Sequence, residues 1–492
     1  MTKINVCQVA AEMVPFAKTG GLADVLGALA PQLNKSNIKA TVFLPLYKQV
    51  KNNTSNLIST GITVNVKIGD NLVSGTIWKT QIQKTDVYFI QRDEYYQRDY
   101  LYGTAEGDYK DNAERFIFFS LAVLEAIKAL GLKCDIIHCH DWQSALIPVY
   151  LKTVYKQDPH LAGVKTLLTV HNLAYQGVFW HWDMKLVGLG WEYFNYKQLE
   201  FYGKVNFLKG GLVFADMLST VSPRYAKEIQ TPLFGERLDG VLRERAGDLH
   251  GIINGVDYNQ WNPAVDKFIP VKYTESKIVG KGKSKQALQK KCGLPVVEAP
   301  IIGMIGRLAS QKGFDLVSGV FDEIIKTGCQ FVLLGTGEEK YHQLFREISR
   351  KYPAQVSANI TFDNSLAHLI TAGADMFLMP SRYEPCGLNQ LYALKYGTIP
   401  IVHETGGLAD SINNYTPKDL KAGTATGFSF KNYYSVEMLG AIKSALILYQ
   451  DKKSWRQLMM NAMAQDFSWG HSSREYIGLY KKLIQLKKHS QK

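Results

Sequence analysis

The sequence predicts an α/β protein made of two doubly wound units, each a parallel sheet with helices on both faces. Short apolar runs alternate with amphipathic stretches along the whole chain, a pattern typical of strand–helix repeats. These runs are almost continuously apolar, as expected for strands that are buried on both faces. At 492 residues, the chain also exceeds what one hydrophobic core usually organises.

The expected strands fall into two series. The first comprises residues 4–9, 41–44, 136–140 and 166–170, and the second comprises residues 301–305, 331–334, 376–379 and 399–402. Helical stretches lie between them, such as residues 111–130 and 316–326. The boundary is predicted near residues 254–283, where residues 277–285 are rich in Lys, Gly and Ser and are expected to be an exposed stretch before a new helix.

Composition narrows the classes of partner. The formal net charge is +13, but the lysines are scattered and we find no zinc-finger or RNA-binding signature, so no nucleic-acid partner is expected. A basic surface that attracts small anions and a merely lysine-rich surface both remain open. No apolar run approaches the ~18 residues of a membrane span, and Glu12 and Lys18 interrupt the apolar start too soon for a signal peptide. The six cysteines are scattered, so we expect a reduced cytoplasmic protein without membrane association.

One six-residue loop occurs twice. Thr19-Gly-Gly-Leu-Ala-Asp24 follows the first expected strand, and Thr405-Gly-Gly-Leu-Ala-Asp410 follows a late strand of the second series. Paired glycines can simply permit a tight turn. They also let a phosphate approach backbone N–H groups at the start of a helix. Two copies in equivalent places favour the functional interpretation, and the second copy is expected to receive phosphates directly on its backbone N–H groups.

Two further polar clusters follow strands of the second series. Arg307 and Lys312 follow residues 301–305, where two fixed cations would suit a diphosphate leaving group; two solvated surface cations are the alternative. Glu384 follows residues 376–379 and can bind sugar hydroxyls or stabilise positive charge, or it can simply favour a helix start. Cys386 has no neighbouring His–Asp sequence and is interpreted as a packing residue.

Polar residues also end two strands of the first series. His138 and His140 share a strand face, but two ligands at this spacing do not make a metal site, and no Asp-x-Asp motif occurs. A buried strand end is therefore predicted there. Asp141 and His171 stand where they could reach a substrate. Aromatic residues between 175 and 202 could stack on sugar rings or belong to the core, and we expect a mixture.

Taken together, the motifs resemble the bacterial glycogen synthase family and the catalytic part of plant starch synthases. The matching stretches cover essentially the whole chain in order: Lys18-Thr-Gly-Gly-Leu-Ala-Asp-Val25, His138-Cys-His-Asp-Trp142, His171-Asn-Leu-Ala-Tyr-Gln-Gly177, Asn254-Gly-Val-Asp257, Gly306-Arg-Leu308, Glu384-Pro-Cys-Gly-Leu388 and Thr405-Gly-Gly-Leu-Ala-Asp410.

The resemblance implies a GT-B fold, with two Rossmann-like domains facing a deep interdomain cleft. It implies an N-terminal domain of residues 1–260 on the acceptor side, completed by the C-terminal segment 467–492, and a nucleotide-sugar domain of residues 261–466. It further implies retaining transfer of glucose from ADP-glucose to the non-reducing end of an α-1,4-glucan such as glycogen, with release of ADP and with neither cofactor nor metal.

The same resemblance implies the site residues. The catalytic group is Glu384, His171, Asp141, Lys312 and Arg307. The substrate-binding group is Lys18, Gly20, Gly21, Asp24, Asn254, Tyr383, Cys386, Gly387, Leu388, Thr405, Gly406 and Gly407.

The chain departs from many retaining GT-B enzymes at one position. They carry a second Glu eight residues after the first, where this sequence has Tyr392. A mechanism that uses a carboxylate pair from this motif is therefore disfavoured, and same-face transfer is expected instead. Three alternatives stay open: UDP-glucose as the donor, a nucleotide-sugar epimerase or hydrolase on the same fold, and a non-catalytic glucan-binding protein.

Overall fold

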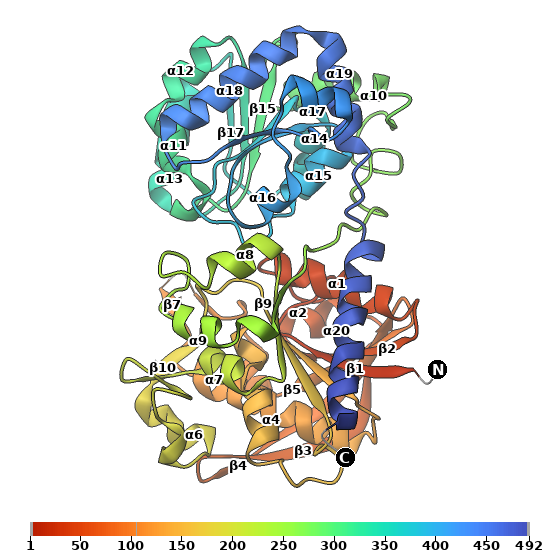
Figure 1. The fold of residues 1–492 in the computed structure, drawn as a ribbon, viewed down its shortest axis with the longest axis vertical. Coiled ribbons are helices and arrows are strands. Elements are labelled where there is room, and N and C mark those ends of the chain that lie inside the picture. The colour runs from red at the N-terminus through yellow and green to blue at the C-terminus, as the bar shows by residue number, and fades with distance from the viewer. Residues whose placement is uncertain (1–2, 105, 490–492) are drawn as a thin grey trace. The chain divides into compact units, whose positions relative to one another are not determined.

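A computed structural model describes residues 3–104 and 106–489. The chain divides into two compact units. Unit 1 contains the described residues up to Val221, Ala226–Gly255 and those from Trp469 onward, whereas unit 2 contains Ser222–Tyr225 and Val256–Ser468. Each has its own sheet and helices, as expected for two α/β units (Figure 1). None of the described helices is both long and apolar enough to cross a membrane.

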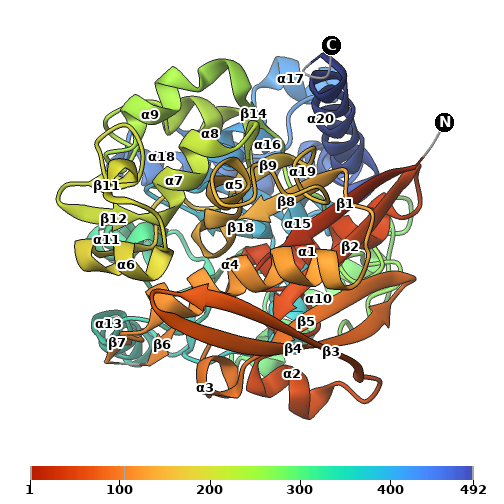
Figure 2. The ribbon, with the colours of Figure 1, turned by 90° about the horizontal axis from the view of Figure 1, so that it is seen from below.

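Unit 1 is built on a nine-stranded sheet in the order β14-β13-β9-β8-β1-β2-β5-β4-β3. Its strands are β1 (Ile4–Val9), β2 (Ile38–Pro45), β3 (Ile58–Ile68), β4 (Asn71–Ile82), β5 (Thr85–Gln91), β8 (Ile136–His140), β9 (Lys165–Val170), β13 (Met217–Thr220) and β14 (Leu249–Gly251). The strands from β14 to β5 are parallel, and β4 and β3 extend the sheet as an antiparallel edge. Figure 2 shows this long β3–β4 pair, an addition to the predicted parallel strands.

Helices and short strands complete unit 1. The helices are α1 (Gly21–Leu33), α2 (Lys48–Asn53), α3 (Asp93–Tyr96), α4 (Asn112–Ala129), α5 (Leu146–Lys152), α6 (Met184–Val187), α7 (Phe207–Phe214), α9 (Asp239–Glu244) and α20 (Trp469–His489), with α8 (Pro223–Glu228) at the division between the units. The short strands are β6 (Gly103–Thr104), β7 (Gly107–Asp108), β10 (Val178–Trp180), β11 (Glu200–Phe201) and β12 (Lys204–Asn206). Single 3-10 turns, η1 to η4, lie at Trp142–Ser144, His181–Asp183, Trp191–Tyr193 and Ala246–Asp248. The last helix, α20, packs along α1 and β9 (Figure 1).

Unit 2 contains a six-stranded parallel sheet in the order β17-β16-β15-β18-β19-β20. Its strands are β15 (Ile301–Ile305), β16 (Gln330–Leu334), β17 (Val356–Asn359), β18 (Met376–Met379), β19 (Ile399–His403) and β20 (Phe428–Phe430). Its helices are α10 (Val279–Lys291), α11 (Phe314–Gly319), α12 (Phe321–Lys326), α13 (Glu339–Lys351), α14 (Asn364–Gly373), α15 (Asn389–Lys395), α16 (Gly406–Ser411), α17 (Pro417–Ala422), α18 (Ser435–Gln450) and α19 (Lys452–Met463). The 3-10 turn η5 covers Ser310–Lys312.

The apolar strands form the core of unit 2. Strands β16, β18 and β19 are buried along their whole length because helices cover both faces of the sheet. Helices α11 and α12 pack with α18, whereas α14 packs with α10 and α15. The helix predicted over residues 316–326 is interrupted, since α11 ends at Gly319 and α12 begins at Phe321.

The prediction of an exposed stretch at residues 277–285 is only partly right, since about half of these residues are exposed. Most of it is the first half of α10, and Lys281 and Lys285 are buried. Lys281 Nζ donates to the carbonyls of Ala372 and Ala374 at 3.0 and 2.9 Å. These carbonyls stand at the C-terminal end of α14, where the last carbonyls of a helix lack partners within the helix. Lys281 therefore caps a neighbouring helix, and burial lowers its pKa to about 7. Lys285 instead forms an ion pair with Asp375 at 2.8 Å.

Candidate active site

In unit 1, the first loop is organised by a buried carboxylate. Glu12 accepts hydrogen bonds from the backbone N–H of Thr19 at 2.5 Å and of Gly20 at 3.1 Å. It also accepts from the Thr19 hydroxyl at 2.6 Å and the Tyr102 hydroxyl at 2.8 Å. Helix α1 begins immediately afterwards, at Gly21. Two N–H groups that were predicted to face a ligand thus donate to Glu12, which was not among the predicted site residues.

Lys18 lies on the accessible side of this loop. Its Nζ is 2.8 Å from Oδ1 of Asp24, and the Lys18 side chain is about half exposed. Desolvation raises the pKa of Asp24, although Lys18 opposes that effect. Two predicted substrate residues are thus brought together, and the cation remains accessible to a ligand.

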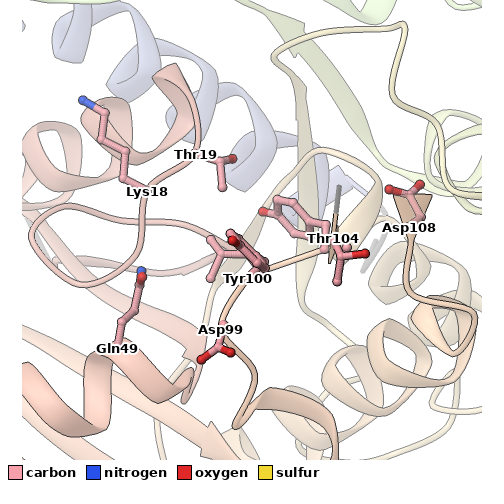
Figure 3. Close-up of a pocket in the computed structure, with 10 residues that line it drawn as sticks. Lys18, Thr19, Gln49, Asp99, Tyr100, Thr104 and Asp108 are labelled. Carbon is pink, nitrogen blue, oxygen red and sulfur yellow. The ribbon is translucent and has the colours of Figure 1, made fainter. Parts of the chain in front are cut away.

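A pocket of about 330 Å³ opens beside Lys18 and Thr19 (Figure 3). Figure 3 shows side chains from the first loop and from the segment after α3 around this pocket. Its other lining residues are Gln49, Asp99, Tyr100, Leu101, Tyr102, Gly103, Thr104 and Asp108. Hydroxyl, amide and carboxylate groups and the Lys18 ammonium group therefore surround a space that can accept a polar ligand.

Asp141 and His171 meet at the carboxyl ends of adjacent strands β8 and β9. Asp141 Oδ1 accepts the backbone N–H of His171 at 2.7 Å. Asp141 has a positive φ of 56°, which is uncommon for a residue other than glycine. Burial raises the pKa of Asp141 to about 7 and lowers that of His171 to about 3. Adjacent strand ends thus carry a carboxyl group and a neutral imidazole.

Asn254 follows β14 and is 5% exposed. Its Oδ1 is buried without a hydrogen-bond partner among the described residues. A buried amide oxygen normally has a partner, so this atom is available to accept from a ligand or from water.

In unit 2, Lys312 and Glu384 form an ion pair. Lys312 Nζ lies 2.6 Å from Glu384 Oε2, and the Ser381 hydroxyl donates to the same oxygen at 2.9 Å. Lys312 ends η5, which follows β15, and Glu384 follows the neighbouring strand β18. Gly313 permits the close approach, because it has a φ of 77° and a Cβ there would lie 2.0 Å from the Pro380 carbonyl oxygen. Ser381 was not among the predicted site residues.

The other residues of this cluster frame the pair. Arg307 is exposed directly beyond β15, and the carbonyl of Tyr383 accepts from Gln311 at 3.1 Å. Cys386 is buried, and Gly387 has a positive φ of 71° just before Leu388 and α15. Three neighbouring strands of one sheet end at these groups. Arg307 and Lys312 follow β15, Glu384 follows β18, and the second glycine loop follows β19. That edge is where ligands bind in open α/β sheets.

The second glycine loop is used partly for internal packing. A Cβ at Gly407 would lie 2.1 Å from the Cys386 carbonyl oxygen. The Gly407 N–H donates to the carbonyls of Glu384 and Pro385 at 3.1 and 3.2 Å. The expectation that this copy offers its N–H groups to phosphate is therefore wrong for Gly407. Thr405 is buried, and Gly406 has a φ of 45° at the start of α16.

Comparison with known proteins places these features in a family. Residues 5–244 match the family model described as the starch synthase catalytic domain, and residues 282–459 match glycosyl transferases group 1. The chain is 47% identical to the glycogen synthase of Koribacter versatilis, over 98% of this chain and 99% of that protein. It is 46% identical to the glycogen synthase of Thermotoga maritima, again over 98% and 99% of the two chains.

A solved structure shows the same fold. The catalytic domain of starch synthase IV from Arabidopsis thaliana, bound to ADP and acarbose, superposes with a TM-score of 0.90 at 32% identity, covering 98% of this chain and 100% of that one. The expected GT-B fold is thereby confirmed. The chain therefore belongs to the glycogen and starch synthase family of glycosyltransferases.

Proposed function

We propose that this protein extends α-1,4-glucan chains, such as glycogen, by transferring glucose from ADP-glucose to the non-reducing end with retention of configuration. The observation that carries the proposal is the Lys312–Glu384–Ser381 cluster in a member of this family. It places a fixed cation and a buried carboxylate at the ligand-binding edge of the unit 2 sheet.

The cations of unit 2 serve the leaving group. In the reaction, the bond between glucose C1 and the ADP phosphate oxygen breaks, and negative charge develops on the diphosphate. Arg307 and Lys312 supply positive charge at that edge, where a preorganised cation stabilises developing charge without reorganising. Lys312 is also held by Glu384, so its position does not depend on the ligand.

The absence of a second carboxylate in this motif supports same-face transfer. Tyr392, eight residues after Glu384, is a packing residue whose ring stacks on Trp261 with centroids 4.0 Å apart. The acceptor 4-hydroxyl would attack glucose C1 on the face that ADP leaves, and its proton would pass to the departing phosphate oxygen. Glu384 would stabilise the positive charge that develops on the glucose ring.

The acceptor is assigned to unit 1. The pocket is lined by hydroxyl groups, carboxylates and the ammonium group of Lys18, all of which can hydrogen-bond sugar hydroxyls. Six exposed aromatic residues lie between residues 175 and 202: Tyr175, Trp180, Trp182, Trp191, Tyr196 and Tyr202. Exposed aromatic faces suit stacking on the sugar rings of a polymer. Phe179 of this segment is instead half-buried, and its ring packs on that of the core residue Phe207 with centroids 4.7 Å apart.

The donor is assigned as ADP-glucose because the starch synthase IV structure contains ADP. Its acarbose, a sugar analogue, supports a glucan acceptor for this chain. The test is incubation with glycogen and ADP-[14C]glucose or UDP-[14C]glucose. Labelled polymer with the ADP donor is expected, and sensitivity of the added label to β-amylase would establish α-1,4 linkage. Free labelled glucose would indicate a hydrolase, an altered sugar nucleotide an epimerase, and an unchanged donor a glucan-binding protein.

The variant that tests the role of Glu384 is Glu384→Gln, which keeps the shape of the side chain and removes its charge. Transfer should fall by about 10²-fold or more, the range for losing one group that stabilises transition-state charge. ADP should still bind, as measured by calorimetry, because Arg307 and Lys312 remain. Near-normal turnover of this variant would remove Glu384 from the mechanism.

A further inference from the structure

A continuous chain of buried polar groups runs from His171 across the sheet of unit 1. It includes side chains from β9, β8, β1 and β13 and one from α20. Its members, in the order of contact, are His171, His140, Gln8, Tyr480, His138, Thr169 and Ser219. All except His171 are fully buried.

The distances define unbroken contacts. His171 Nε2 lies 3.0 Å from His140 Nδ1, and His140 Nε2 lies 2.7 Å from Gln8 Oε1. The Gln8 amide nitrogen donates to the Tyr480 hydroxyl at 2.9 Å, which contacts His138 Nδ1 at 2.8 Å. His138 Nε2 lies 2.6 Å from the Thr169 hydroxyl.

The orientation of the Gln8 amide decides which atom donates in each hydrogen bond of this series of side chains. Because an amide oxygen only accepts, the proton between His140 and Gln8 must be on His140 Nε2. Desolvation lowers the pKa of His140 well below its usual value, so this ring is neutral and carries one proton. Its Nδ1 is then an acceptor, and the proton in the contact with His171 must be on His171 Nε2.

We propose that Gln8 and Tyr480 are positioning residues that hold His171 in the neutral tautomer protonated on Nε2, so that its Nδ1 acts as a hydrogen-bond acceptor. His171 is a predicted catalytic residue at the carboxyl end of β9, so this inference rests on the proposed function. If the Gln8 amide were turned over, donor and acceptor would exchange in each of these hydrogen bonds, and His171 Nδ1 would become a donor.

Tyr480 makes the C-terminal helix part of this support. Gln8 has both of its amide atoms engaged, one with His140 and one with Tyr480. Without the Tyr480 hydroxyl, the Gln8 amide nitrogen loses the acceptor that keeps it pointing toward α20. The amide is then free to turn, and the preference between the two His171 tautomers is lost. Helix α20 is thus connected to the predicted catalytic residue His171 through hydrogen bonds that start at Tyr480 and pass through Gln8 and His140.

The test combines three variants of the hydrogen-bonded chain with a matched control. Tyr480→Phe removes only the hydroxyl, Gln8→Leu breaks the chain, and Gln8→Glu keeps an acceptor for His140. Tyr150→Phe is the control, since Tyr150 is also fully buried in unit 1 and its hydroxyl donates to the Val187 carbonyl at 3.0 Å. The protein is labelled with 15N-histidine, and the His171 signals are assigned by their loss in His171→Gln.

The 15N shifts distinguish the two neutral tautomers. The parent and Tyr150→Phe should show His171 protonated on Nε2, whereas Tyr480→Phe and Gln8→Leu should show a mixture, and Gln8→Glu should restore the parent signal. The kcat should fall about 10- to 100-fold in Tyr480→Phe and Gln8→Leu, the range for residues that orient a functional histidine, with KM for the donor little changed.

Two results would overturn the proposal: an unchanged His171 tautomer in both Tyr480→Phe and Gln8→Leu, or an equal loss of kcat in Tyr150→Phe. The tautomer is read without substrate, so the spectra test the positioning role even if the parent lacks transferase activity. A parent without that activity would instead refute the proposed function.

Discussion

The ammonium group of Lys312 lies 2.6 Å from the carboxylate of Glu384, although 72 residues separate them in the sequence. The carboxylate side chain is 8% exposed and the lysine side chain 24% exposed. Removing the lysine is costly, because the Glu384 carboxylate then stays buried without its partner.

Lys312→Ala should therefore lower both activity and stability. We expect kcat to fall at least 10²-fold, since a cation facing the leaving phosphate is lost. Unfolding free energy should fall by about 3 kcal/mol, the range for removing one partner of a buried pair. Urea denaturation and initial rates measure the two effects.

Arg382→Ala, on the loop after β18 that also carries Glu384, is the control for the Lys312 variant. Arg382 pairs with Asp315 at 3.3 Å, but both side chains are largely exposed. Such a pair contributes about 0–1 kcal/mol. Equal destabilisation by the two substitutions would contradict the distinction between the buried and the exposed pair.

The two glycine loops should respond differently to a methyl group. Gly407→Ala would place Cβ 2.1 Å from the Cys386 carbonyl oxygen, so the backbone that carries Glu384 must move. We expect a loss of about 1–3 kcal/mol and of most activity. Gly20→Ala meets no atom within 4 Å, and its φ of −146° is ordinary extended backbone. The thermal midpoint of Gly20→Ala should stay near that of the parent, and a matching loss in both variants would refute separate roles.

Asp141 should make stability depend on pH. Its pKa of about 7 lies above the value of about 3.9 for an unfolded chain, so the folded state holds the proton more tightly. The contribution of Asp141 to the free energy of unfolding is fully present below pH 4 and is lost as pH rises through 7. The loss amounts to up to about 4 kcal/mol. Asp141→Asn keeps an oxygen acceptor for the His171 N–H and cannot ionise.

The Asp141→Asn variant should thus gain stability over the parent as pH rises from 5 to 8, while its activity falls. Urea midpoints measured at both pH values check this. A difference between variant and parent that does not change with pH would show that Asp141 titrates normally.

The exposed tryptophans should affect polymer binding alone. Trp180 is 61% exposed, and its ring lies edge-on to that of Trp182 at a centroid distance of 6.2 Å. Trp180→Ala should weaken binding to glycogen about tenfold, with kcat on short malto-oligosaccharides unchanged. Tyr434→Ala, at a 64% exposed site in unit 2, is the control. Affinity electrophoresis in glycogen gels measures binding; equal mobility of the two variants would exclude this tryptophan from the glucan surface.

The sequence by itself located many of the parallel core strands and the polar residues that end them. Runs such as Ile136–His140 are local signals, because a buried strand must be apolar over consecutive residues. Parallel strands bring their carboxyl ends to one edge, so the residues after β15, β18 and β19 could be grouped before any contact was known. The order of motifs was enough to recognise the family.

Only the tertiary structure decided which polar groups pair. Glu12 lies next to the first loop in sequence, yet no local pattern shows that it takes the loop's N–H groups. Tyr480 is 472 residues from Gln8, and their contact exists because α20 returns to the unit 1 sheet. From the sequence, Lys281 resembles a solvated linker lysine; in the structure it donates to a carbonyl at the end of α14. Apolar periodicity reports the burial of a segment, whereas a buried hydrogen bond depends on how distant segments meet, which that periodicity does not encode.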